Sequence, residues 1–117
     1  MNVLFILNHP PYDTEHCFNA LRLAAAMAKK APEVQVTVFL MADSVLCAKA
    51  GQKTPDGCYN IERMLKHVLT GLGQVLLCGV CMDARGLAED DIVEGARRST
   101  MDELAENTLQ ADKVLVF

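Results

Sequence analysis

Two kinds of hydrophobic pattern alternate along this chain. In the first kind, apolar residues follow one another almost without interruption, which is typical of strands covered on both faces. In the second kind, apolar positions recur every three or four residues, which predicts amphipathic helices. The strands expected from the first pattern are 2–7, 34–41, 74–78 and 112–117, with a brief strand at 96–99.

Helices are expected between these strands, each bounded by residues that favour a helix end. The first begins at a cap on Asp13 or Thr14 and continues to Lys30. The last begins at Thr100, where Glu103 completes a capping box. The other helices are expected at 43–50, 60–72 and 87–95, and loops at 8–13, 52–57 and 79–86.

The alternation of apolar strands with helices predicts a parallel sheet with helices on both faces, an α/β fold. The chain has 117 residues, near the common size for one hydrophobic core, so we expect a single domain over residues 1–117. Hydrophobic residues make up 51% of the chain, aromatic residues only 5%, which disfavours an aromatic-rich β-sandwich. So high an apolar fraction also indicates that another subunit covers some surface, and we expect a homo-oligomer.

Charge and hydropathy argue against several classes of protein. The net charge is −4, and the densest basic groups, Lys29-Lys30 and Arg97-Arg98, are interpreted as helix-end pairs rather than a nucleic-acid surface. No window approaches the roughly 18 apolar residues of a membrane span, and the first residues do not resemble a signal peptide. We therefore expect a cytoplasmic protein that binds neither nucleic acid nor membrane. No phosphate loop or dinucleotide fingerprint occurs, and no cofactor is expected.

Among five cysteines, Cys78 and Cys81 stand apart because they follow a wholly apolar strand. Ligands of open parallel sheets bind beyond the carboxyl ends of the strands. A thiol reacts as its thiolate, which needs positive potential, and Arg85 or the N–H groups of the turn can supply it. Gly79 and Gly86 let the backbone turn tightly and approach a bound group. The pair is thus a candidate for a reactive thiol.

Spacing alone leaves other interpretations of this pair open. Both cysteines can be packing residues, as free cysteines often are and as we expect for Cys17 and Cys47. A thioredoxin-type dithiol is disfavoured because that motif opens directly onto a helix, whereas residues 83–86 intervene here. Zinc would need two further ligands, and only isolated histidines and cysteines are available. Asp83 and Arg85 can also pair with each other, which would leave the thiol unassisted.

Short motifs in a fixed order along nearly the whole chain resemble one known family. The strongest is Cys78-x-x-Cys81-x-Asp83-x-Arg85-Gly86; the others are Pro11-Tyr12, 18–24, 39–43, 51–53, 59–61 and 111–117. Together these motifs are similar to the DsrE/TusD-like sulfur-relay superfamily, most closely to its small stand-alone YchN-like (DsrE/F-like) branch. The resemblance implies a three-layer flavodoxin-like fold with a central, mainly parallel five-stranded sheet, assembled into trimers or hexamers.

The resemblance also implies a function. Better-studied relatives carry a persulfide on a cysteine just after the third strand, a position that corresponds to Cys78, and pass the sulfur to a partner. Cys81 is the second cysteine typical of the YchN-like branch. The hypothesis is a sulfur-trafficking protein, a sulfurtransferase if it turns over, with donor and acceptor proteins as partners. The expected site consists of Cys78 and Cys81 with the binding residues Arg85, Gly86, Asn8 and Tyr12.

Two alternatives stay open beside sulfur transfer. One is a non-enzymatic oligomeric module in which the loops 8–12, 41–43 and 78–86 hold a small ligand or metal. The other is a dithiol redox protein that uses Cys78 and Cys81 as its reactive pair. Per-cysteine alkylation rates against pH would separate these alternatives, because each predicts a different thiol acidity.

Overall fold

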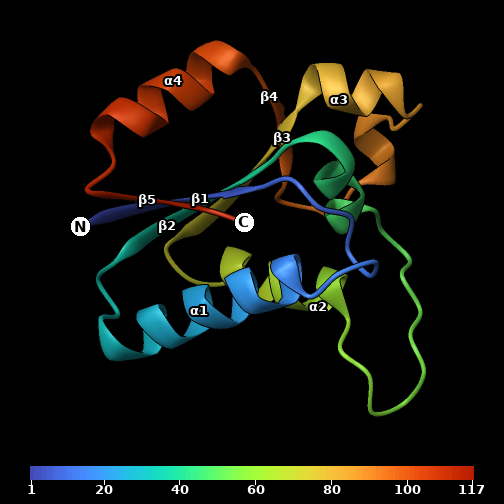
Figure 1. Cartoon of the computed structure of the whole chain (residues 1–117), viewed down its shortest axis with the longest axis horizontal. Helices are drawn as coiled ribbons and strands as arrows, with labels where there is room; N and C mark the ends of the chain where they lie inside the picture. The colour runs from blue at the N-terminus through green and yellow to red at the C-terminus, as the bar shows by residue number, and fades with distance from the viewer.

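A five-stranded parallel sheet forms the centre of the molecule (Figure 1). The computed structural model describes all of residues 1–117, and the strand order is β4-β3-β2-β1-β5. Every neighbouring pair is parallel, so the carboxyl ends of the strands lie at one edge. The strands are β1 Asn2–Leu7, β2 Gln35–Leu40, β3 Gly73–Cys78, β4 Arg97–Ser99 and β5 Lys113–Val116. The predicted α/β fold with a central parallel sheet is confirmed.

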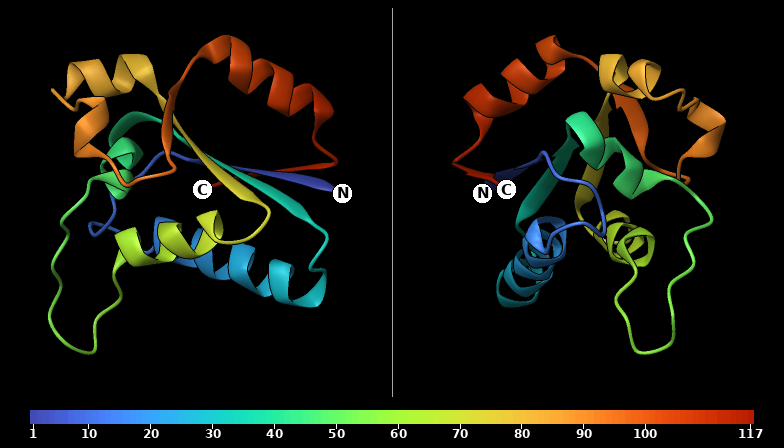
Figure 2. Two further views of the ribbon diagram at one scale, coloured as in Figure 1. Left: turned by 180° about the vertical axis from the view of Figure 1, so that it is seen from behind. Right: turned by 45° about the vertical axis from the view of Figure 1, so that its right-hand side comes forward.

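Helices cover both faces of this sheet (Figures 1 and 2). One face is covered by α1, His16–Lys30, and α2, Ile61–Leu69, which pack against each other. The opposite face is covered by α4, Met101–Gln110. The short helix α3, Gly79–Ala84, follows β3 directly, and the 3-10 helix η1, Ala42–Ala48, comes after β2. None of the helices is both long and apolar enough to cross a membrane.

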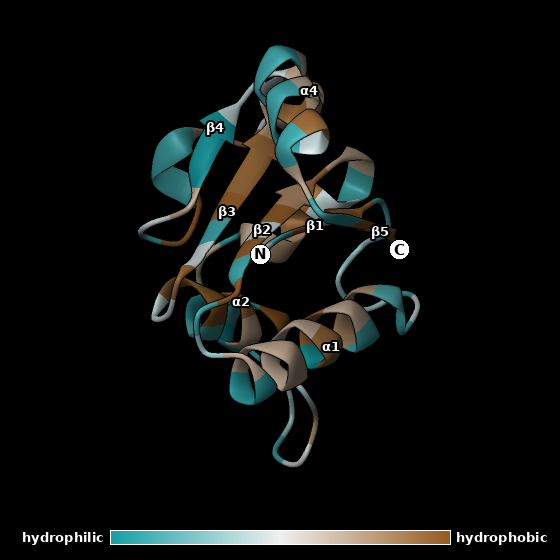
Figure 3. Cartoon of the chain, turned by 90° about the vertical axis from the view of Figure 1, so that its left-hand side faces the viewer, coloured by the Kyte–Doolittle hydropathy of each residue, from teal (hydrophilic) through white to brown (hydrophobic).

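The two faces of the sheet differ greatly in how much apolar side chain they bury. The core on the α1–α2 side contains 22 buried residues, whereas the cluster under α4 contains only 4. Figure 3 shows the apolar β2 and β3 between these two layers. On the thinly covered side, Met101 and Leu109 of α4 and Val116 of β5 are exposed to solvent. The α4 side is therefore the more open one.

Some predicted element boundaries are correct and others are wrong. Thr100 caps α4 as predicted, accepting the N–H of Glu103 at 3.2 Å. By contrast, α1 begins after Glu15 rather than after Asp13 or Thr14. The helices predicted at 43–50 and 60–72 end earlier in the structure: η1 ends at Ala48 and α2 at Leu69.

The largest errors concern the region after β3. Residues 79–86, expected as a loop, form α3 over most of their length. Residues 87–95, expected as a helix, contain only the single 3-10 turn η2, Glu89–Asp91. The flanking backbone bonds to the η1 segment instead: the Val93 N–H donates to the Ala48 carbonyl at 2.8 Å. Leu87 and Val93 are buried in the main core, and their burial outweighs the local helix signal of the acidic run.

Candidate functional site

Cys78 lies at the junction between β3 and α3. It is the last residue of the strand, in register with Ser99 of β4, and also the N-cap of α3. Its Sγ accepts the N–H of Cys81 at 3.3 Å. The Cys78-x-x-Cys81 motif therefore opens directly onto a helix. The sequence-based argument against a dithiol, which placed a loop here, is wrong.

Cys81 lies in the first turn of α3, and its sulfur has a backbone donor of its own. The Cys81 Sγ accepts the N–H of Ala42, the first residue of η1, at 3.2 Å. Ala42 has φ of 51°, the left-handed region that residues with a side chain rarely occupy. Both half-buried cysteines of the pair thus have an N–H donor at their sulfur, one from within the motif and one from the start of η1.

Burial, followed by contact with the Cys81 thiol, raises the pKa of the Cys78 thiol. The N–H groups of Cys81 and Val80 act in the opposite direction but do not outweigh these effects. At neutral pH Cys78 therefore rests as a neutral thiol.

Arg85, the arginine expected to face Cys78, is engaged elsewhere. Its Nε and Nη2 both lie 2.8 Å from Asp43 Oδ1, and its Nη1 donates to the Cys81 carbonyl at 3.1 Å. These bonds tie the end of α3 to η1. No bond joins Arg85 to the Cys78 sulfur, and the Asp83–Arg85 pair left open from the sequence does not form.

Arg98 of β4 is the arginine that lies beside the start of α3. Its Nη1 and Nη2 donate to the two carboxylate oxygens of Asp83, each at 2.8 Å, and hold the pKa of that carboxyl below its usual value. The guanidinium lies over Gly79: a Cβ placed on this glycine would be 2.8 Å from the Arg98 Cζ. Sequence reasoning missed Arg98 because it interpreted residues 97–98 as a helix end. The pairing of β4 with β3, which places Ser99 beside Cys78, cannot be recognised from the local sequence.

A cavity of about 430 Å³ lies next to these groups on the α4 side of the sheet. Arg98 is the only charged residue in its lining, which is otherwise mostly apolar. The remaining lining residues include Phe39, Met41, Cys78, Gly79, Val80, Cys81, Ser99, Thr100 and Met101. A small molecule or the tip of a partner protein can therefore reach the thiols in largely apolar surroundings.

The other three expected binding residues do not line this cavity. The Asn8 side chain donates to the carbonyl of Phe117 at 3.4 Å and fixes the end of the chain. The Tyr12 hydroxyl accepts the Ile61 N–H at 3.1 Å. Gly86 has φ of 65° and ends α3 in a turn, with open space where a Cβ would be. Asn8 and Tyr12 thus have a structural contact, and Gly86 a turn conformation, that accounts for their positions.

A second cysteine pair lies in the main core. Cys17 and Cys47 are both fully buried, which confirms that they are packing residues. The Cys17 Sγ donates to the His9 carbonyl at 3.1 Å, and the Cys47 Sγ lies 4.0 Å from the same oxygen. The contact between the thiols lowers the pKa of Cys17 and, together with burial, strongly raises that of Cys47. Cys58 is exposed.

A metal site is not supported by the arrangement of donors. No group of three or more His, Cys, Asp or Glu side chains comes together in a way that could hold a metal ion. The histidines do meet: the rings of His9 and His16 stack with centroids 3.9 Å apart. Two histidines alone fall short of the three or more side chains that hold a metal ion, so this pair is not a ligand set.

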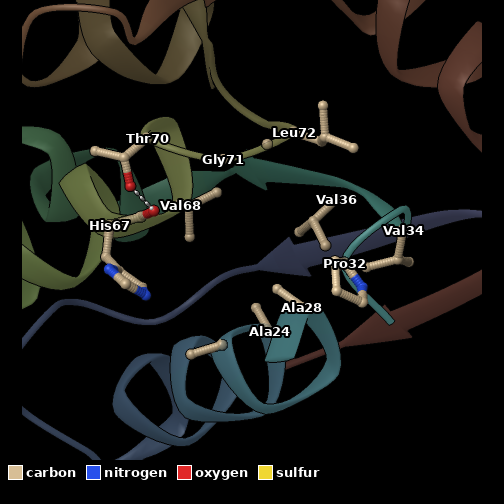
Figure 4. Close-up of a pocket in the computed structure, with 12 residues that line it drawn as sticks. Ala24, Ala28, Pro32, Val34, Val36, His67, Val68, Thr70, Gly71 and Leu72 are labelled. Atoms are coloured by element: carbon tan, nitrogen blue, oxygen red, sulfur yellow. Dashed lines mark hydrogen bonds between the residues drawn. The ribbon is translucent and has the colours of Figure 1, made fainter. Parts of the chain in front are cut away.

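A smaller apolar hollow of about 230 Å³ lies at the opposite, amino end of the sheet (Figure 4). It lies between the ends of α1 and α2, with Ala24 and Ala28 on one side and Val68 on the other. Within its lining, the Thr70 hydroxyl donates to the His67 carbonyl at 2.7 Å. The hollow contains no cysteine and is separate from the site at Cys78.

Comparisons with known proteins agree with the sequence motifs. The model of the DsrE/DsrF-like family matches residues 1–117. "Protein YchN" from Escherichia coli (strain K12) is 39% identical over 115 residues, which cover 98% of this chain and 97% of that protein. "Uncharacterized protein MK0008" from Methanopyrus kandleri is 33% identical over 115 residues, 98% of this chain and 93% of that protein.

Solved structures show the same similarity in three dimensions. The crystal structure of YchN from E. coli superposes with a TM-score of 0.94 over 99% of this chain and 98% of that one. MTH1491 from Methanobacterium thermoautotrophicum, a protein of unknown function, superposes with a TM-score of 0.82 at 12% identity, over 99% and 98% of the two chains. The second similarity shows that the fold persists where the sequence has diverged.

Proposed function

On the premise that this chain belongs to the DsrE/DsrF-like family, we propose that it carries sulfane sulfur as a persulfide on Cys78 and transfers it to a partner thiol. The observation that carries this proposal is the position of Cys78. Its sulfur lies at the carboxyl end of a buried parallel strand, accepts an N–H at 3.3 Å and lines an open cavity. Ligands of such sheets bind at this edge.

Loading follows from ordinary thiol chemistry. The Cys78 thiol loses its proton and attacks the outer sulfur of a donor persulfide, R–S–SH. A new S–S bond forms on Cys78 while the donor S–S bond breaks, and the donor leaves as R–SH after taking up a proton. The sulfur moves at constant oxidation level, so the step needs neither oxidant nor reductant.

Cys81 provides a second fate for the bound sulfur. A partner thiolate can attack the outer sulfur of the Cys78 persulfide, which regenerates the Cys78 thiol and leaves the partner as the new persulfide. The Cys81 thiolate can instead attack the Cys78 Sγ, which forms a Cys78–Cys81 disulfide and expels hydrosulfide. The Ala42 N–H donates to the Cys81 Sγ at 3.2 Å, so the attacking sulfur has a backbone hydrogen-bond partner in the folded protein.

A dithiol redox protein is the second candidate function. Cys78 and Cys81 lie at the start of a helix, with the Cys78 Sγ accepting the Cys81 N–H, an arrangement compatible with reversible disulfide formation. Sulfur transfer and dithiol exchange make different demands on Cys81. The redox function requires both thiols, whereas persulfide transfer to a partner requires Cys78 alone.

We further propose a cytoplasmic homo-oligomer, a trimer or hexamer of one DsrE/F-like domain, that works with donor and acceptor proteins. The thin cover of the α4 face supports self-association, because Met101, Leu109 and Val116 are exposed together with other large apolar side chains. Light scattering during size-exclusion chromatography measures the mass directly. Elution as a monomer at micromolar concentration would contradict the oligomer.

Intact-mass spectrometry tests the proposed function. The reduced protein is incubated with a low-molecular-weight persulfide and freed of the donor; uptake of one sulfur atom adds about 32 Da. We expect uptake by the wild type, by Cys81→Ser and by the control Cys58→Ser, and loss of uptake in Cys78→Ser. Conversion of the wild type to the Cys78–Cys81 disulfide, about 2 Da lighter than the reduced protein, with a retained adduct only in Cys81→Ser, would favour the redox dithiol. Full uptake by Cys78→Ser would exclude the proposal.

A further inference from the structure

The cavity beside Cys78 has an unusual combination of an apolar lining and a single charge. Its lining is mostly apolar and contains one charged side chain, Arg98. A persulfide is more acidic than its parent thiol, so a sulfur atom added to Cys78 brings negative charge into this lining. A charge in apolar surroundings is costly unless a counterion meets it. Arg98 is the only lining residue that can be that counterion.

Gly79 makes close approach by Arg98 feasible. The guanidinium lies against the Cα of this glycine, immediately after Cys78 in the chain. Any Cβ at position 79 would lie 2.8 to 2.9 Å from three guanidinium atoms, closer than real Cβ atoms come to their neighbours. The glycine gives Arg98 a route across the backbone of α3 towards the cysteine.

The present partner of Arg98 is exchangeable. The Asp83 carboxylate is 64% exposed and the Arg98 side chain 40% exposed, so solvent and salt screen the pair. A guanidinium has five donors in a planar fork and can turn some of them to a second anion while keeping the first. The pair therefore holds the guanidinium beside the cysteine without immobilising it.

We propose that Arg98 is the anion-binding residue of this site, which turns from Asp83 towards the outer sulfur of a Cys78 persulfide and holds that sulfur in its anionic form. The inference rests on the proposed persulfide function and adds to it a residue for recognising the cargo. Asp83 is the positioning residue that keeps the guanidinium over Gly79 while no sulfur is bound. Arg98 stays protonated throughout, and the proton of the persulfide goes to solvent.

The other charged groups near this site do not replace Arg98. Arg85 is bound to Asp43 and to the Cys81 carbonyl. Glu89 acts on Arg98 from the segment after α3, and Asp83 acts on it from α3 itself; both are negative and compete with the persulfide for the guanidinium. The neutral donors at Cys78 are backbone N–H groups, which carry no net charge.

The test measures the acidity of the persulfide on the loaded protein. Wild type and variants are loaded with a low-molecular-weight persulfide, and the alkylation rate of the Cys78 persulfide is followed against pH by mass spectrometry. In Arg98→Gln we expect the rate at a pH below the transition to fall about tenfold, a shift of about one pH unit. Arg98→Lys keeps the charge and is expected to restore most of the rate. Gly79→Ala, which displaces the guanidinium, is expected to resemble Arg98→Gln.

Two further variants make the outcome decisive. Arg97→Gln removes the neighbouring arginine of β4, which binds Glu103 rather than the cavity, and is expected to behave as wild type. Asp83→Asn removes a competing anion and is expected to move the transition in the opposite direction, to lower pH, a result that general destabilisation would not give. If Arg98→Gln and Arg97→Gln have the same profile, the inference is overturned while the persulfide function stands. If wild-type Cys78 takes up no sulfur, both fall.

Discussion

The molecule contains two cysteine pairs whose surroundings differ in almost every respect. Cys17 and Cys47 lie in the main core, fully buried, with both thiols near one carbonyl oxygen. Cys78 and Cys81 are half-buried at the carboxyl edge of the sheet, and each sulfur accepts a backbone N–H. In the first pair the surroundings supply a hydrogen-bond acceptor, in the second pair donors.

This difference bears on reactivity. A carbonyl oxygen accepts the hydrogen bond of a thiol, whereas backbone N–H groups and a nearby arginine can stabilise an anion once it forms. At Cys78, burial and the Cys81 thiol outweigh the N–H groups and raise the pKa. Cys78 and Cys81 also line an open cavity, whereas Cys17 and Cys47 are fully buried. The two pairs thus differ in solvent access and in hydrogen-bond surroundings, while each cysteine has one neighbouring thiol.

The largest expected contrast is in alkylation of the two pairs under native conditions. Cys17 and Cys47 can react only after the core opens, so we expect their rates to be at least about 1,000-fold below that of exposed Cys58. Cys78 and Cys81 are expected within about 100-fold of Cys58, because solvent reaches them in the folded state. Peptide mapping after timed alkylation measures all five rates. Equal alkylation rates for Cys47 and Cys78 would contradict the difference in solvent access between the two pairs.

Removal of a cysteine sulfur should reduce stability more in the buried pair than in the half-buried pair. Cys47→Ala leaves a void in the closely packed core and is expected to lower the free energy of unfolding by about 1–2 kcal/mol. Cys78→Ala removes a half-buried group beside a cavity, and a loss below about 0.5 kcal/mol is expected. Urea unfolding with Cys58→Ala as the control measures both. A greater loss of unfolding free energy in Cys78→Ala than in Cys47→Ala would show that Cys78 is a packing residue.

The pH dependence of Cys78 provides a third, smaller contrast. Because burial and the Cys81 thiol raise the pKa of Cys78, its alkylation rate should rise with a midpoint above the ordinary thiol value of about 8.5. The same shift contributes stability that is present below the unfolded pKa and is lost as pH rises through the folded one. Cys81→Ala removes the second cause and should move the midpoint down. An unmoved midpoint would show that burial alone is responsible.

The smallest expected effect is that of Arg85. Its ion pair with Asp43 is partly exposed, with side-chain exposures of 28% and 56%, so Arg85→Gln is expected to cost less than about 1 kcal/mol of stability. The alkylation rate of the Cys78 thiol should change less than about threefold, because Arg85 does not contact that sulfur. A tenfold fall would reinstate Arg85 as the counterion, as the sequence alone suggested.

The sequence predicted the sheet and the pair of interest, because both depend on local pattern. Continuous apolar runs mark buried strands, and Cys78 follows such a run directly. The sequence did not predict which arginine lies near Cys78. That depends on the pairing of β4, a strand of only three residues, with β3. The sequence also did not predict the helix that follows Cys78, because a cysteine N-cap and a six-residue helix give a weak local signal.

The central claim is that Cys78, among five cysteines, is the position that carries sulfur. The most direct measurement is the location of sulfane sulfur in the wild-type protein after incubation with a low-molecular-weight persulfide and alkylation of the unfolded chain. Fragmentation of the peptide that contains both Cys78 and Cys81 places the additional mass of about 32 Da on one or the other. The account predicts that mass on Cys78 and none on Cys17 or Cys47. Sulfur on exposed Cys58, or spread evenly over the accessible thiols, would contradict it.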